Sequence, residues 1–171
     1  MGTVFTNDGE KMFVWEKRGV VYVATRNAQQ LYDRQETQVL NITSEVGNWA
    51  DHGLMSMALD PNFSGTTGGY IYLLYVVDRR FLLSDNSIPA DQGFDATIGR
   101  ITRYKVINSG GLLIIDPSPA ERKVLLGETP GTGIPILHDS HGLGSIIFAE
   151  DGTLLGILSR SDVMRFLQMR S

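Results

Sequence analysis

The chain has 171 residues, of which 42% are hydrophobic, 20% charged and 9% aromatic, a composition typical of a globular domain and not of a disordered or fibrous chain. Its formal net charge is −4 and its basic residues are scattered, which argues against nucleic-acid binding. Cysteine is absent, which excludes disulfides and thiolate metal sites, and no apolar run approaches the roughly 18 residues that a membrane span needs.

The opening residues, Met1 to Gly9, contain no basic segment followed by an apolar run, so no signal peptide is expected. They enter a strand-like pattern at once, which suggests that residues of a longer protein precede them. Short runs of β-branched and aromatic residues then alternate with Gly, Asn, Asp and Pro, a pattern that predicts strands. The expected strands are Lys11 to Glu16, Val20 to Thr25, Gln38 to Ile42, Met55 to Leu59, Tyr70 to Val77, Ile101 to Ile107, Lys123 to Leu126, Ser145 to Ala149 and Thr153 to Leu158.

Two turns predict antiparallel pairing. Gly19 closes the turn that begins at Glu16, and Gly152 closes a second turn that begins at Glu150. The chain is therefore expected to be all-β. Repeated hairpins of this kind are compatible with a sandwich, a barrel or a propeller, and periodicity does not choose among them.

Two long segments, Arg79 to Ile98 and Gly127 to Gly144, are expected to be loops, and a site is expected there. A single short helix is predicted at the C-terminal end of the chain, over Asp162 to Gln168. Ser159 or Ser161 would cap it, and its apolar residues recur at helical spacing.

Four stretches in chain order carry a resemblance to a known family. They are Lys11 to Val23, with Glu-Lys-Arg-Gly-Val-Val; Gly53 to Phe63, followed by Gly69 to Tyr75; Gly99 to Tyr104; and Ser140 to Gly152, with His-Gly-Leu-Gly and Phe-Ala-Glu-Asp-Gly. Together they resemble the N-terminal portion of the glucose/sorbosone dehydrogenase family, the soluble aldose dehydrogenases that depend on pyrroloquinoline quinone (PQQ).

The resemblance implies a partial β-propeller of about three blades of antiparallel sheet over residues 2–155. In the family, PQQ lies over the channel of a six-bladed propeller, with calcium ions, and an aldose is oxidised at its anomeric carbon. His141 matches the general base, and Asp51, Gly142 and Gly144 match positions that contact the cofactor. The family is typically periplasmic or secreted, and its substrate is a sugar.

The chain departs from the family pattern in three ways. Asp51 stands where the family often has Gln or Glu, Leu143 replaces the first Gly of a pair, and Asp60 stands where many relatives have His. The segments that would supply the later blades have no counterpart in this sequence. We therefore expect the chain alone to hold neither PQQ nor calcium, and we expect its open sheet edges to allow self-association.

The tail resembles a different family. Residues 147–168 are similar to the C-terminal end of a CBS domain, an adenosyl-ligand-binding module, which implies a ribose-binding role for Ser159 and Asp162. We therefore assign residues 156–171 to a CBS-like strand and helix. Capping of the predicted helix is the alternative role of Ser159 and Asp162.

Two functions remain open at this point. The first is a fragment of a PQQ-dependent sugar dehydrogenase, inactive by itself, and the alternative is a non-catalytic binding or interaction module with a nucleotide-binding tail. No metal site is predicted, since His138 and His141 lack a third ligand at suitable spacing. Simpler roles are expected elsewhere: surface or supporting positions for His52 and His138, sheet packing for Tyr70 and Tyr72, and solvated charges for Asp78, Asp85, Asp91 and Asp95.

Overall fold

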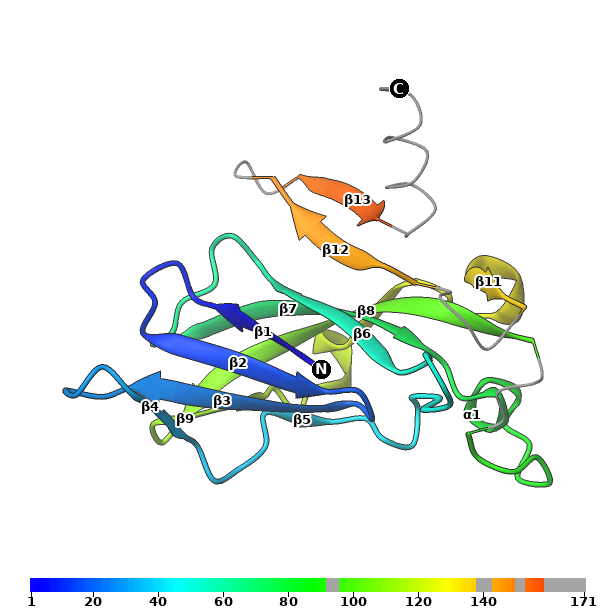
Figure 1. Ribbon diagram of the computed structural model, residues 1–171, viewed down its shortest axis with the longest axis horizontal. Coiled ribbons are helices and arrows are strands. Elements are labelled where there is room, and N and C mark those ends of the chain that lie inside the picture. Colours follow the sequence, from blue (N-terminus) through cyan, green and yellow to red (C-terminus); the bar gives the residue numbers. More distant parts are fainter. Residues whose placement is uncertain (92–95, 138–142, 150–152, 159–171) are drawn as a thin grey trace.

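The structure, a computed structural model, describes residues 1–91, 96–137, 143–149 and 153–158. It consists mainly of antiparallel sheets with one short α-helix, which confirms the all-β prediction (Figure 1). The helix predicted over Asp162 to Gln168 lies outside the described residues. Within those residues, no helix has the length and apolar character needed to cross a membrane.

The first sheet contains five strands, joined in the order β1-β2-β3-β4, with β5 also paired to β3. They are β1 (Gly2–Phe5), β2 (Lys11–Glu16), β3 (Val20–Arg26), β4 (Tyr32–Arg34) and β5 (Leu40–Asn41). The predicted turn between β2 and β3 is confirmed: the Gly19 amide donates to the Glu16 carbonyl at 2.9 Å, and Gly19 has a φ of 97°. That positive φ is a conformation that glycine adopts without a steric penalty.

The second sheet contains six strands, joined in the order β10-β8-β7-β6, with β9 and β11 also paired to β8. They are β6 (Leu54–Leu59), β7 (Gly68–Val76), β8 (Thr97–Ser109), β9 (Leu112–Ile115), β10 (Lys123–Leu126) and β11 (Ile134–Ile136). A third sheet pairs β12 (Ser145–Phe148) with β13 (Leu154–Leu158). The antiparallel pairing predicted for this last hairpin is confirmed, although its turn lies outside the described residues.

Both segments predicted as long loops contain regular structure. The first holds helix α1 (Arg79–Leu83), because the Asp78 carboxylate accepts from the Phe81 amide at 3.3 Å and caps the first turn. The second holds β11, which pairs with the start of β8. Short 3-10 turns occur at Pro119–Glu121 and Pro130–Thr132.

The second sheet is buried on both faces. Odd-numbered residues of β7 pack with the first sheet, as shown by Leu73 and Tyr75 in one cluster with Phe13 and Val21. Even-numbered residues such as Leu74 join a second cluster, which also contains residues from β11, β12 and the segment before β12. This two-sided burial explains why β7 reads as an almost continuous apolar run.

The first strands of the three sheets lie side by side. Strand β6 contacts both β1 and β12, and the Ile146 amide of β12 donates to the Ser56 hydroxyl of β6 at 3.2 Å. The beginnings of these strands border one cavity, and their later residues border another. The three strands therefore run in the same direction, with the sheets extending outward from them.

A substitution at Gly99 tests the packing of the segment before β12 on β8. A Cβ at position 99 would lie 2.4 Å from Cδ2 of Leu143. We expect Gly99→Ala to lower the free energy of unfolding by about 1–3 kcal/mol through overpacking. In a Leu143→Ala background the same change should cost less than half as much, which urea unfolding of the four proteins measures as a double-mutant cycle. Additive costs would contradict this packing.

Candidate functional site

A cavity of about 490 Å³ lies at the end of the sheets where β6 and β12 begin. It is lined by Met1, Lys17, Ala50, Asp51, Leu54, Met55 and Leu143. Two segments that the sequence analysis singled out thus come together here: Asp51 precedes β6, and Leu143 and Gly144 precede β12. His141, Gly142, Ser159 and Asp162 lie outside the described residues, so their predicted roles stay predictions.

The turn between β2 and β3 fixes the Asp51 segment. The Lys17 ammonium donates to the Ala50 carbonyl, and the Leu54 amide donates to the Lys17 carbonyl at 2.6 Å. Gly53 allows this close approach, because a Cβ there would lie 2.4 Å from Cγ of Lys17. His52 is 2% exposed, so it is a buried side chain beside the cavity and not a surface one. Asp51 itself is exposed.

The described residues at this cavity can be compared with the chemistry of PQQ, which carries carboxylates. The cavity volume is within the range of small-molecule sites, and the Lys17 ammonium can pair with a carboxylate of the quinone. The Asp51 carboxylate, in contrast, repels such a group. Among the residues that the structure describes, no cluster of three or more His, Asp or Glu side chains could hold a metal ion. The described residues thus offer one positive charge and one negative charge to a ligand in this cavity, and no cluster of side chains that could hold a metal ion.

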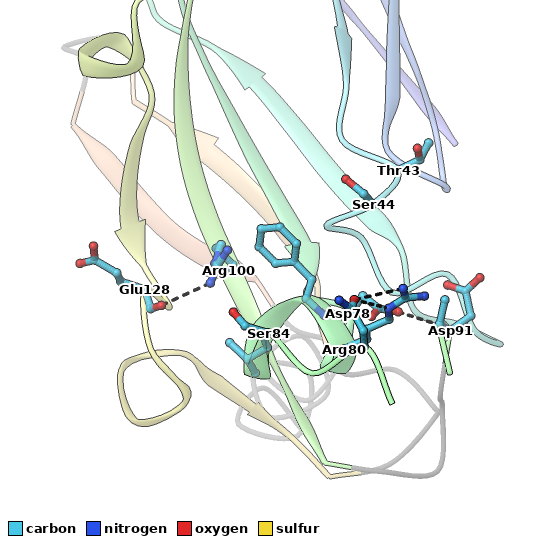
Figure 2. Close-up of a pocket in the computed structure, with 12 residues that line it drawn as sticks. Thr43, Ser44, Asp78, Arg80, Ser84, Asp91, Arg100 and Glu128 are labelled. Atoms are coloured by element: carbon cyan, nitrogen blue, oxygen red, sulfur yellow. Dashed lines mark hydrogen bonds between the residues drawn. The ribbon is translucent and has the colours of Figure 1, made fainter. Parts of the chain in front are cut away.

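A larger, polar pocket of about 710 Å³ lies beside α1 (Figure 2). It is lined by Thr43, Ser44, Asp78, Arg80, Phe81, Leu82, Ser84, Asn86, Ala90, Asp91, Arg100 and Glu128. Asp78 is buried here, where it accepts from the backbone amides of Phe81 and Asp91 at 3.3 and 2.7 Å. The expectation of a solvated charge at Asp78 is therefore wrong, because two backbone amides replace its water.

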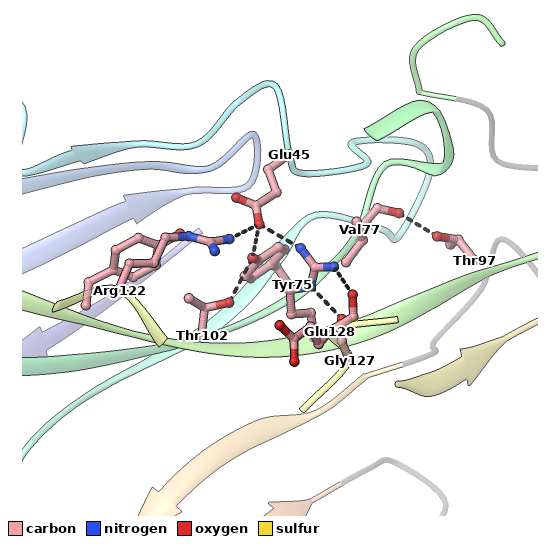
Figure 3. Close-up of polar contacts among 10 residues, drawn as sticks. Glu45, Tyr75, Val77, Thr97, Thr102, Arg122, Gly127 and Glu128 are labelled. Carbon is pink, nitrogen blue, oxygen red and sulfur yellow. Dashed lines mark hydrogen bonds and ion pairs between the residues drawn. The ribbon is translucent and has the colours of Figure 1, made fainter. Parts of the chain in front are cut away.

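A buried polar network lies between the first and second sheets (Figure 3). One oxygen of Glu45 accepts from the Tyr75 hydroxyl and from the Arg100 guanidinium, both at 2.8 Å, and also from Arg122. Arg100 donates further to the Gly127 carbonyl at 2.7 Å. Glu45 and Arg100 are each 5% exposed, so their charges compensate each other away from water.

The sequence analysis did not single out Glu45, Arg100 or Arg122. Side chains alternate between the two faces of β8, so Arg100, Thr102 and Tyr104 lie on the same face. This spacing alone could have indicated that the three side chains are neighbours. No local pattern pairs them with Glu45, which lies 55 residues before Arg100 and 77 before Arg122. Their arrangement compensates buried charges, which is a structural role, and Arg100 also lines the polar pocket.

No known family model matches this chain, and a search of curated proteins finds no match.

Removing the Glu45 carboxylate should strongly destabilise the fold. Glu45→Ala leaves the buried Arg100 uncompensated, so we expect a loss of about 3–5 kcal/mol in the free energy of unfolding. The control is Glu121→Ala, which breaks the more exposed pair between Glu121 and Lys105 at 3.4 Å and should cost less than about 1 kcal/mol. Chemical denaturation measures both, and equal losses would show that the network contributes no more than a surface ion pair.

The network also predicts a loss of stability at high pH. Burial, and then the charge of Glu45, raise the pKa of Tyr75 above its ordinary value. The folded protein therefore keeps this phenolic proton above about pH 10, where the unfolded chain releases it, and stability falls as pH rises through that window. Tyr75→Phe should make the loss of stability between pH 9 and pH 11 smaller by about 1.4 kcal/mol in total, as measured by urea unfolding across that range. Identical slopes for the two proteins would contradict a raised pKa.

Proposed function

We propose that these sheets are successive blades of a quinone-dependent sugar dehydrogenase propeller and that the cavity lined by Asp51 and Leu143 is part of its quinone site. The observation that carries the proposal is the arrangement of β1, β6 and β12. They lie side by side as the first strands of their sheets, and the residues just before β6 and β12 border one cavity. Blades of a propeller radiate in this way from a central channel.

The residues of this chain would then take distinct parts in the reaction. PQQ, when bound, supplies the acceptor for hydride from the anomeric carbon of an aldose. His141, as a neutral imidazole, takes the proton of the anomeric hydroxyl. Lys17 pairs with a carboxylate of the quinone, and Gly142 and Gly144 leave room for the ring to approach the backbone. Asp51 lies at the edge of the cavity.

This chain supplies only part of such a site. We propose that further blades, absent from this sequence, complete the quinone and calcium contacts, so that the chain alone does not oxidise sugar. Unpaired edges of the described sheets, such as the outer edge of β13, offer backbone donors and acceptors to another strand. Either a further blade or a second copy of this chain could pair there.

Substitution of Asp51 tests the quinone site directly. Asp51→Gln removes a negative charge that repels the carboxylates of PQQ. It also introduces the longer side chain that the resembled family often has at this position. We expect it to tighten PQQ binding in the presence of calcium by about fivefold, the equivalent of about 1 kcal/mol, measured by equilibrium dialysis. Asp51→Asn should give a smaller gain, because it removes the charge without adding length.

Asp33→Asn, at an exposed carboxylate on β4, is the matched control for the loss of a surface charge and should leave binding unchanged. Dye reduction with glucose should stay at background for all four proteins. The proposal fails if Asp51→Gln retains no more PQQ than the wild type does, or if Asp33→Asn strengthens binding as much as the Asp51 variants do.

A further inference from the structure

The polar pocket beside α1 is separate from the proposed quinone cavity, and the two share no lining residue. Phe81 lines the polar pocket and is 42% exposed, an unusual position for a large aromatic side chain. The Arg100 guanidinium lies 5.9 Å from the centroid of the Phe81 ring. The pocket therefore combines an accessible aromatic surface with a fixed positive charge.

Several polar groups around the pocket are available to a ligand. Within the described part of the chain, the hydroxyls of Thr43, Ser44 and Ser84 and the carboxylate of Glu128 make no hydrogen bond, whereas the Glu128 backbone carbonyl accepts from Arg100. In Figure 2, Thr43 and Ser44 lie on one side of the view, Glu128 lies on the other, and Ser84 lies between them. A ligand seated there would meet donors and acceptors from several directions.

Other groups are held in place before any ligand arrives. Two nitrogens of Arg80 donate to the Asn86 side-chain oxygen at 3.2 and 3.1 Å. Asp91 accepts from the Asn48 amide at 2.7 Å, and Asp78 accepts from the Asp91 amide at the same distance. Such preorganisation lowers the entropy that a ligand must lose on binding, because these side chains are already ordered.

The chemistry of the lining selects one class of ligand. The lining carries both carboxylates and guanidinium groups, so an anion would be repelled by Asp78, Asp91 and Glu128, and a cation by Arg80 and Arg100. A ligand whose hydroxyls both donate and accept can use both kinds of group and the free Ser and Thr hydroxyls as well. The apolar face of a sugar ring can also pack on the exposed Phe81 ring.

We propose that this pocket is a binding site for a small neutral carbohydrate, distinct from the quinone cavity and independent of the dehydrogenase reaction. The proposal does not require PQQ, calcium or any blade beyond those described. It makes Phe81 the packing surface of the site and Glu128 one of its hydrogen-bond acceptors.

The test is calorimetric titration of the full chain with glucose and with maltose, and with citrate as an anionic comparison. We expect binding of at least one of the sugars and none of citrate. Phe81→Ala should weaken sugar binding at least tenfold, and Glu128→Gln should weaken it severalfold. Leu83→Ala is the matched control, because Leu83 belongs to the same helix and is 45% exposed but does not line the pocket.

Three outcomes would overturn the proposal. The first is the absence of heat with either sugar at tens-of-millimolar concentration, and the second is binding of citrate in preference to sugar. The third is that Phe81→Ala and Leu83→Ala weaken sugar binding equally. That result would show either that the sugar binds elsewhere or that any substitution in α1 weakens binding. Melting curves of all variants show whether each substitution leaves the fold intact.

Discussion

The Glu45 carboxylate is the interaction on which the rest of the structure depends, because it joins the segment after β5 to the second sheet. One of its oxygens receives hydrogen bonds from β7, β8 and the segment before β10 through Tyr75, Arg100 and Arg122. The backbone carbonyl of Glu45 also accepts a hydrogen bond from the Asp78 amide at 2.9 Å. Since burying a carboxylate and a guanidinium costs several kcal/mol each without such partners, this network favours the relative position of the two sheets in which both groups are satisfied.

That position also determines where the two cavities lie. Leu54 of β6 is opposite Tyr75 of β7, so β7 ends where β6 begins, and α1 follows at the same end of the sheet. The cavity lined by Asp51 and the polar pocket lined by Asp78 therefore lie at one end of a rigid double layer, on the segments that connect its strands. Ligand-binding residues commonly occupy such connections, because a packed scaffold fixes their positions while the connections vary.

The strands that could be predicted from sequence are those whose side chains alternate or that form a buried apolar run. Strands β2 and β10 have the bounds that their patterns predict, β8 extends beyond its predicted bounds at both ends, and β7 begins two residues before its predicted start and ends one residue before its predicted end. Strand β9 was missed, although Gly110 and Gly111, with φ of 62° and 90°, form the two-residue turn that is a strong local hairpin signal. The three-residue strands β4 and β11 have no such signal, since only pairing with β3 and β8 makes them strands.

The candidate site was harder to predict, because its surroundings depend on contacts between distant segments. Leu143, which stands where the resembled family has glycine, illustrates this. In the structure its terminal methyl groups pack against Gly99 of β8, where only a residue without a Cβ leaves enough space. The Leu143 side chain is thus accommodated partly by the second sheet, whereas Asp51 is exposed at the cavity, where its charge bears directly on which ligands can bind.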